Sequence, residues 1–162
     1  MKRTIFAAVV LCGMLTVAWA TSQGDLRLPK NASEYEHINT LFVPDEKLPV
    51  FGIHHFYMND KGLPTFSKSQ GKVTYPDGTI ILGRVYDVVP RDDAGFEEGK
   101  LLAYTYMEKN KDNPMTKVTG GWIFAKFSPD GKRMDINPAA DCFPCHAPLS
   151  QSDFVFSDPL KR

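Results

Sequence analysis

Four stretches of the chain combine β-branched and aromatic residues in the way that is typical of strands. They run from Val50 to Met58, Thr79 to Val89, Lys100 to Glu108 and Gly121 to Ser128. Turn residues lie beside them, at Asn59-Asp60-Lys61-Gly62, Pro76-Asp77-Gly78 and Pro129-Asp130-Gly131. Strands joined by turns predict an antiparallel sheet. The charged stretches that contain proline and glycine, 90–99 and 109–120, are predicted to be loops.

Residues typical of helix starts occur in the sequence both before and after the predicted strands. Near the start, Ser33 can cap a helix and Glu36 can complete its capping box. The apolar face of that helix would then carry Tyr35, Ile38 and Phe42. Near the end, Asn137 followed by Pro138 predicts a short C-terminal helix, which ends at Pro148. The predicted fold class is therefore α+β: an antiparallel β-sheet with an N-terminal helix and a short C-terminal helix.

The C-terminal helix contains the sequence Cys142-Phe143-Pro144-Cys145-His146. C-x-x-C-H is the attachment sequence of a c-type haem. Two thiols three positions apart can each bond to one vinyl group of a porphyrin, and the histidine that follows can bind the iron. We therefore predict one covalently attached haem c at Cys142 and Cys145, with His146 as the iron ligand. The predicted C-terminal helix is then the haem-binding helix.

Three other uses of this motif fit the chain less well. A thioredoxin-like redox pair belongs to a βαβ unit, whereas only residues 147–162 follow the motif. A zinc site needs about four convergent ligands, and the only other histidines of the chain are His37, His54 and His55. A structural disulfide across so short a loop would add little stability.

The first twenty residues have the three parts of a secretory signal peptide. Met1-Lys2-Arg3 is positively charged, Ile5 to Val17 is apolar, and Ala18-Trp19-Ala20 is a small-x-small cleavage site. We expect cleavage after Ala20 and a single domain over residues 21–162 that starts at Thr21. Two alternatives are a retained membrane anchor, for which the apolar run is shorter than the ~20 residues of a spanning helix, and a lipoprotein attached at Cys12, which more apolar residues follow.

Composition narrows the range of partners. The chain has 19 basic and 19 acidic residues, and they form no basic stripe, so nucleic acid is not an expected partner. No membrane contact is expected once the signal peptide is removed. Eleven phenylalanines suit a protein that lines the apolar face of a porphyrin, although an aromatic-rich β core would account for them equally well.

Six segments, taken in this order, resemble the family of cytochrome P-460 and the related cytochrome c-prime-beta. They are Leu28-Pro29-Lys30-Asn31 with Glu34-Tyr35, Ile53 to Asn59, Pro76-Asp77-Gly78-Thr79, Gly121-Trp122, Asp141 to His146, and Asp153-Phe154-Val155-Phe156. The resemblance implies a sheet-based, often dimeric monohaem protein of the bacterial periplasm. It also implies that His146 is the proximal ligand and that the other side of the iron is open to nitrogen oxides or carbon monoxide.

The family has two chemical branches, and three positions separate this chain from the branch that oxidises hydroxylamine. In that branch a lysine cross-linked to the porphyrin should fall at Gly83, and the nearby Arg84 points to the other face of the strand. Where that branch tends to carry an arginine, this chain has His54. The expected mid-strand carboxylate is also missing, since Tyr104 and Tyr106 stand there and the only acid is Glu108.

These departures favour the c-prime-beta branch, which binds NO or CO at a five-coordinate iron behind an apolar cap. Strand alternation places His54, Phe56 and Met58 on one face and Ile53, His55 and Tyr57 on the other. The residues expected to line or cap the haem are Phe51, His54, Phe56 or Phe66.

Two alternatives stay open. An oxidoreductase acting on hydroxylamine or NO would need a proton acceptor, for which His54 and Glu108 are the candidates. An electron-transfer cytochrome would need a sixth ligand, for which the methionines available are Met58, Met107, Met115 and Met134. A redox partner protein and a homodimer are both compatible with these interpretations.

Overall fold

The structure is a computed structural model, and it describes residues 26–68 and 72–157. The signal peptide predicted over residues 1–20, together with Cys12 and the expected start at Thr21, lies outside the described residues. Within the described ranges, no helix is both long and apolar enough to cross a membrane.

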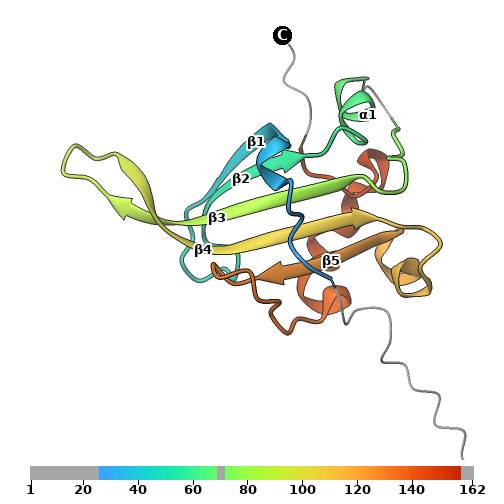
Figure 1. Cartoon of the computed structure of the whole chain (residues 1–162). Coiled ribbons are helices and arrows are strands. Elements are labelled where there is room, and N and C mark those ends of the chain that lie inside the picture. Colours follow the sequence, from blue (N-terminus) through green and yellow to red (C-terminus); the bar gives the residue numbers. More distant parts are fainter. Residues whose placement is uncertain (1–25, 69–71, 158–162) are drawn as a thin grey trace, which may run out of the picture.

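A five-stranded antiparallel sheet dominates the fold (Figure 1). Its strands follow one another in space as they do in the sequence: β1 (Glu36–Val43), β2 (Gly52–Met58), β3 (Ile80–Pro90), β4 (Phe96–Lys109) and β5 (Trp122–Phe127). The prediction of an α+β fold built on an antiparallel sheet is confirmed, and β2 to β5 correspond to the four predicted strands.

The prediction of an N-terminal helix capped by Ser33 is wrong, because the chain is already extended at Tyr35. Only a three-residue 3-10 helix, η1 (Ala32–Glu34), forms there, and β1 follows it directly. A bulge between His37 and Asn39 shifts the register of β1 against β2 and leaves Ile38 buried. Tyr35 and Ile38 are therefore both buried, but in different core clusters. Their spacing of three, which suggested a helix face, comes from a bulged strand.

Both predicted loops contain regular structure. Strands β3 and β4 run on into the segment 90–99, so the hairpin loop shrinks to residues 91–95, and the end of this hairpin extends beyond the other strands (Figure 1). Segment 109–120 contains the 3-10 helix η2 (Pro114–Thr119), capped by Asn113, whose side chain accepts a hydrogen bond from the Met115 amide. A short helix that was not predicted, α1 (Leu63–Lys68), follows β2.

The sheet has an apolar cluster on each face. One cluster includes Met58, Ile81, Met107 and Phe124, and Cys142 and Phe143 of the haem motif pack against it. The other cluster includes Tyr35, Leu82, Tyr106 and Phe127. We call the side of the first cluster the haem face, because it is the side that contacts the motif.

The C-terminal segment forms three short helical turns on the haem face. A π-helical turn, η3 (Pro138–Cys142), leads into α2 (Phe143–His146) and then into the 3-10 helix η4 (Ala147–Ser152). The predicted short haem-binding helix is present, but the chain does not leave the helical path at Pro148. The Asn137 side chain makes no cap, and its backbone amide instead donates to the Asp141 carboxylate at 2.7 Å.

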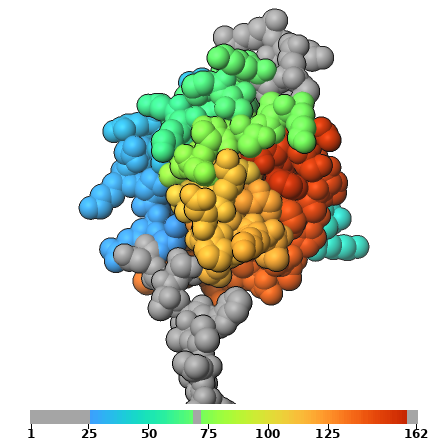
Figure 2. Space-filling model, turned by 90° about the vertical axis from the view of Figure 1, so that its right-hand side faces the viewer, coloured from blue at the N-terminus to red at the C-terminus, as the bar shows by residue number. Residues whose placement is uncertain are grey.

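Segments far apart in the sequence hold this C-terminal region in place. The backbone amide of Val73 donates to the Gln151 carbonyl at 2.9 Å, which ties η4 to the chain before β3. The space-filling view shows the C-terminal residues, in orange and red, packed beside that chain segment and beside η2 (Figure 2). The haem motif therefore packs against the folded domain.

Candidate haem-binding site

Of the two motif thiols, Cys142 lies at the end of η3 and Cys145 lies within α2. Cys142 is partly buried against the haem-face cluster, while Cys145 is exposed, and both are free thiols. Burial raises the pKa of the Cys142 thiol, and the neighbouring Asp141 carboxylate adds to this effect. Haem attachment requires two thiols at this spacing that form no disulfide, and Cys142 and Cys145 meet this requirement.

The His146 ring is held in one orientation by a hydrogen bond to the backbone of another residue and by contacts with aromatic rings. Its Nδ1–H donates to the carbonyl oxygen of Phe154 at 2.7 Å, and because a carbonyl can only accept, the proton is on Nδ1. The ring makes edge-on contacts with the rings of Phe124 and Phe156, at centroid distances of 4.9 and 4.8 Å. Burial lowers the pKa of His146, which favours the neutral ring. The Nε2 lone pair is therefore available for a metal, the form in which histidine binds iron.

A row of four side-chain positions crosses the haem face from β2 to β5. Strand pairing places Phe56 opposite Gly83, Gly83 opposite Thr105, and Thr105 opposite Lys126. The next row contains Met58, Ile81, Met107 and Phe124, which belong to the haem-face cluster. Opposed residues of antiparallel strands share a face, so the first row extends the wall on which the motif packs.

Gly83, where the resemblance places a cross-linking lysine, has little room for any side chain. A Cβ atom there would lie 2.2 Å from Thr105 Oγ1 and 3.1 Å from Phe56 Cε1. Arg84 lies on the opposite face, with its guanidinium carbon 4.7 Å from the centroid of the Tyr57 ring. No cation of β3 within the described residues therefore reaches the haem face.

His54 lies on the haem side of β2 and is only 6% exposed. Its Nε2–H donates to the Val50 carbonyl at 2.7 Å, and its ring stacks on Phe56 at a centroid distance of 5.8 Å. Burial is the main cause of its lowered pKa, which the charges of Lys126 and His55 lower further while the Val50 bond opposes them. The ring is therefore neutral near pH 7, and one nitrogen is committed to the backbone.

The predicted capping phenylalanines lie in different places. Phe56 stands in the wall beside Gly83, Phe66 is buried in the haem-face cluster from α1, and Phe51 is half-buried just before β2. Of the methionines considered as ligands, Met58 and Met107 are buried in the same cluster, whereas Met115 and Met134 are exposed.

Glu108 does not join this group. It follows Met107 on β4 and so points to the opposite face, where its carboxylate accepts a hydrogen bond from the Tyr106 hydroxyl at 2.8 Å. Its charge also contributes to the raised pKa of Tyr35, although burial contributes more. This placement argues against Glu108 as a proton acceptor at the haem.

His37 and His55 also lie away from the motif. Both rings contact the Thr40 hydroxyl, at 3.0 and 2.8 Å, and His55 additionally pairs with Glu98. In the part of the chain that the structure describes, no three His, Cys, Asp or Glu side chains converge as a metal site. Of the three histidines that a zinc site could have used, His37 and His55 lie on the face of the sheet opposite the motif.

Lys126 is a haem-face residue that was not predicted from the sequence. Its charge is close enough to contribute to lowering the pKa of both His54 and Cys142. Alternation along β5 would have placed it with Phe124 on the haem face, because the two residues are two positions apart. Its position beside Thr105 follows from the register of β4 against β5, which the sequence alone does not give.

A family model described as cytochrome P460 matches residues 29–157, which is most of the chain. The match spans η1, all five strands and the haem motif. A comparison with curated proteins gave no match.

Proposed function

Because the chain belongs to the cytochrome P460 family of haem-binding cytochromes, we propose that it is an exported monohaem c-type cytochrome that binds NO or CO at a five-coordinate iron. The observation that carries the proposal is the state of His146. Its Nδ1–H is fixed by the Phe154 carbonyl and its Nε2 is left to bind metal.

The chain offers a complete set of groups for holding one haem. Cys142 and Cys145 would each add their S–H across a vinyl group, so that a C–S bond forms and the proton moves to the other vinyl carbon. His146 would supply the axial nitrogen. The aromatic side chains of Phe124, Phe143 and Phe156 provide apolar surface around it. When bound, the haem supplies an iron that takes a diatomic ligand.

On the sheet wall, Phe56 forms an apolar patch beside Gly83, while Thr105 and Lys126 in the same row are polar. The Val50 carbonyl engages Nε2 of His54, so that nitrogen could bind iron only by losing this hydrogen bond, and Nδ1 is the nitrogen left free. Position 83 carries glycine instead of the cross-linking lysine, and Phe56 and Thr105 occupy the space that a longer side chain would need there. The patch formed by Phe56 suits small, neutral, weakly polar ligands.

One observation supports a second candidate function. His54 is a neutral, buried imidazole on the haem face, so it could accept a proton from a substrate such as hydroxylamine. An oxidoreductase acting on hydroxylamine or NO is therefore the alternative, with His54 and not Glu108 as its proton acceptor.

Export and partners belong to the same proposal. The N-terminal leader supports a periplasmic location, where c-type haem is attached, and small nitrogen oxides or CO would be the ligands. A redox partner would be required by the oxidoreductase alternative. A homodimer remains compatible with the family resemblance.

The test uses protein produced in a host with a cytochrome c maturation system. We expect intact mass after denaturation to equal the chain from Thr21 plus one haem, and ferrous spectra to shift on adding CO or NO. Loss of the haem on denaturation would overturn the attachment. A six-coordinate iron that binds no CO would overturn gas binding, and steady hydroxylamine-dependent reduction of an acceptor would favour the alternative.

A further inference from the structure

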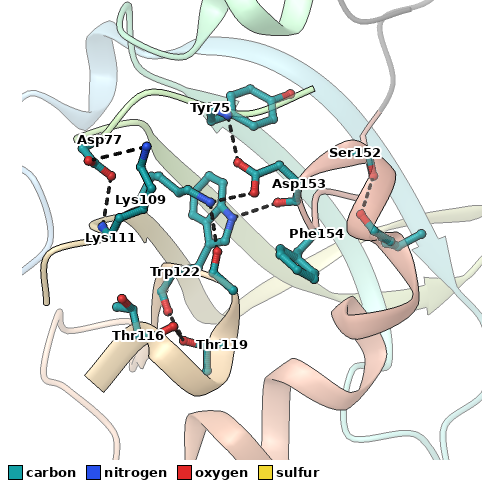
Figure 3. A network of polar contacts seen from close by, with 12 residues as sticks. Tyr75, Asp77, Lys109, Lys111, Thr116, Thr119, Trp122, Ser152, Asp153 and Phe154 are labelled. Atoms are coloured by element: carbon teal, nitrogen blue, oxygen red, sulfur yellow. Dashed lines mark hydrogen bonds and ion pairs between the residues drawn. The ribbon is translucent and has the colours of Figure 1, made fainter. Parts of the chain in front are cut away.

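Asp153 makes contacts to three separate segments of the chain. Its Oδ1 accepts from Lys109 Nζ at 2.6 Å, its Oδ2 accepts from the Tyr75 amide at 2.8 Å, and its carbonyl accepts from Trp122 Nε1 at 2.8 Å (Figure 3). The donors come from β4, from the segment before β3 and from the start of β5. A residue held from three sides has a fixed backbone orientation.

The ion pair within this network is buried. The side chains of Lys109 and Asp153 are only 2% and 8% exposed. Lys109 Nζ also donates to the Gly120 carbonyl at 3.0 Å and lies 5.0 Å from the centroid of the Trp122 ring. A buried charge that loses its partner is strongly unfavourable, so each member holds the other in place.

The backbone at this point has an unusual shape. Asp153 and Phe154 both adopt positive φ angles, 51° and 66°; aspartate tolerates this region, but it is unfavourable for phenylalanine. The two left-handed residues turn the chain after η4 so that the Phe154 carbonyl meets His146 Nδ1 at 2.7 Å. Such a conformation persists only where surrounding contacts hold it, and the contacts of Asp153 do so.

The Phe154 side chain is fixed as well. A Cβ atom on Gly120 would lie 2.1 Å from the Phe154 ring, so the ring packs directly on that backbone. The ring also lies 5.3 Å from Phe143 of the haem motif. Both the side chain and the carbonyl of Phe154 are therefore positioned by residues outside the motif.

From this geometry we infer that Asp153, paired with Lys109, is a positioning residue for the haem: it holds the Phe154 carbonyl against His146 and so sets the strength of the iron–histidine bond. A firm hydrogen bond from Nδ1–H makes the imidazole a stronger electron donor, which stabilises ferric over ferrous iron. The inference rests on the proposed haem attachment and goes beyond it.

The experiment compares Asp153→Asn and Trp122→Phe with the wild-type holoprotein. Both variants should lower the iron–histidine stretching frequency in resonance Raman spectra of the ferrous ligand-free form, and both should raise the reduction potential. Trp122→Phe removes one hydrogen bond to the Asp153 carbonyl and keeps the ion pair, so it provides the test if Asp153→Asn does not fold.

Thr116→Val is the matched control. Thr116 is 1% exposed and its hydroxyl donates to the carbonyls of Asn110 and Asn113, so the variant should lose thermal stability without touching Asp153. A wild-type stretching frequency and potential in both test variants, with lowered melting temperatures only, would overturn the inference.

The test of haem attachment and the test of the positioning role of Asp153 can fail independently. If the wild-type chain carries no haem, the proposed function fails. Nitrogen-15 NMR of the histidines in that haem-free chain still decides the positioning role. The Nδ1–H form of His146 should dominate in the wild type and lose ground in both variants, and equal tautomer populations in all three would contradict it.

Discussion

Phe56 and Gly83 lie opposite one another on β2 and β3, and the Phe56 ring occupies part of the space that a side chain at position 83 would need. Thr105 closes the same space from β4. The glycine is therefore part of a packed wall. The neighbouring Phe56 and Thr105 side chains leave no room for a lysine at this position. This relationship supports an iron site without a protein–porphyrin bond on β3.

Packing around Gly83 can be tested with one methyl group. Gly83→Ala should destabilise the protein by about 1–3 kcal/mol, the usual cost of overpacking, because the new Cβ would lie 2.2 Å from Thr105 Oγ1. Adding Thr105→Ala removes the nearest atom and should restore most of the loss. Urea denaturation of the single and double variants measures both effects. Equal destabilisation in the single and double variants would contradict the proposed crowding.

The buried ion pair predicts unequal roles for two nearby lysines. Lys109→Met should lower the free energy of unfolding by about 3–5 kcal/mol, because it leaves the Asp153 carboxylate buried without its partner. Lys111 is the matched control: its side chain is 50% exposed and lies 3.9 Å from Asp77. Lys111→Met should change stability by no more than about 0.5 kcal/mol. Similar losses in both variants would show that burial of the pair is not decisive.

Strands β2 to β5 and the haem motif could be predicted from sequence because their signals are local. Turn residues bound the strands, and the three motif residues are adjacent along the chain. Alternation also assigned His54 and Tyr57 to opposite faces of β2, and the two core clusters agree with that assignment. Local rules were sufficient wherever a residue and its partner follow a regular pattern.

The remaining features depend on contacts that no local pattern encodes. The bulge at Ile38 buries this residue three positions after Tyr35, which is also the spacing of a helix face. The bulge is recognised only when β1 is paired with β2. The Phe154 carbonyl reaches His146 because of two left-handed residues with ordinary side chains, which the sequence does not mark. Lys126 gains its significance from the register of β4 against β5. Long-range pairing decided each of these features.

Glu108 offers a test of the two sheet faces. Because it lies on the side away from the motif, Glu108→Gln should leave the ferric and ferrous absorption spectra and the CO affinity unchanged. The same substitution should lower the pKa of Tyr35, since the Glu108 charge helps to raise it. Alkaline absorbance titration of the tyrosines measures that change. A loss of CO binding or of hydroxylamine turnover in this variant would place Glu108 at the haem after all.

His54 is expected to make stability depend on pH. Its pKa in the folded chain is lowered below the ordinary value of 6.5, mainly by burial. The unfolded chain therefore takes up the proton more readily, and the free energy of unfolding should fall as the pH drops below about 6.5. The slope from this one group is at most about 1.4 kcal/mol per pH unit. His54→Leu should make the fall shallower, which urea denaturation at several pH values would show.

The same variant tests whether His54 binds the iron. Its Nε2 already donates to the Val50 carbonyl, so His54→Leu should leave the iron five-coordinate and high-spin in both oxidation states. A change from six- to five-coordinate spectra would show instead that His54 was a ligand of the metal. Gas affinity then separates the remaining roles: an unchanged CO and NO affinity would place the ring outside the ligand pocket. A loss of hydroxylamine-dependent electron transfer would identify His54 as the proton acceptor of an enzyme, because only that role needs its free nitrogen to take up a proton.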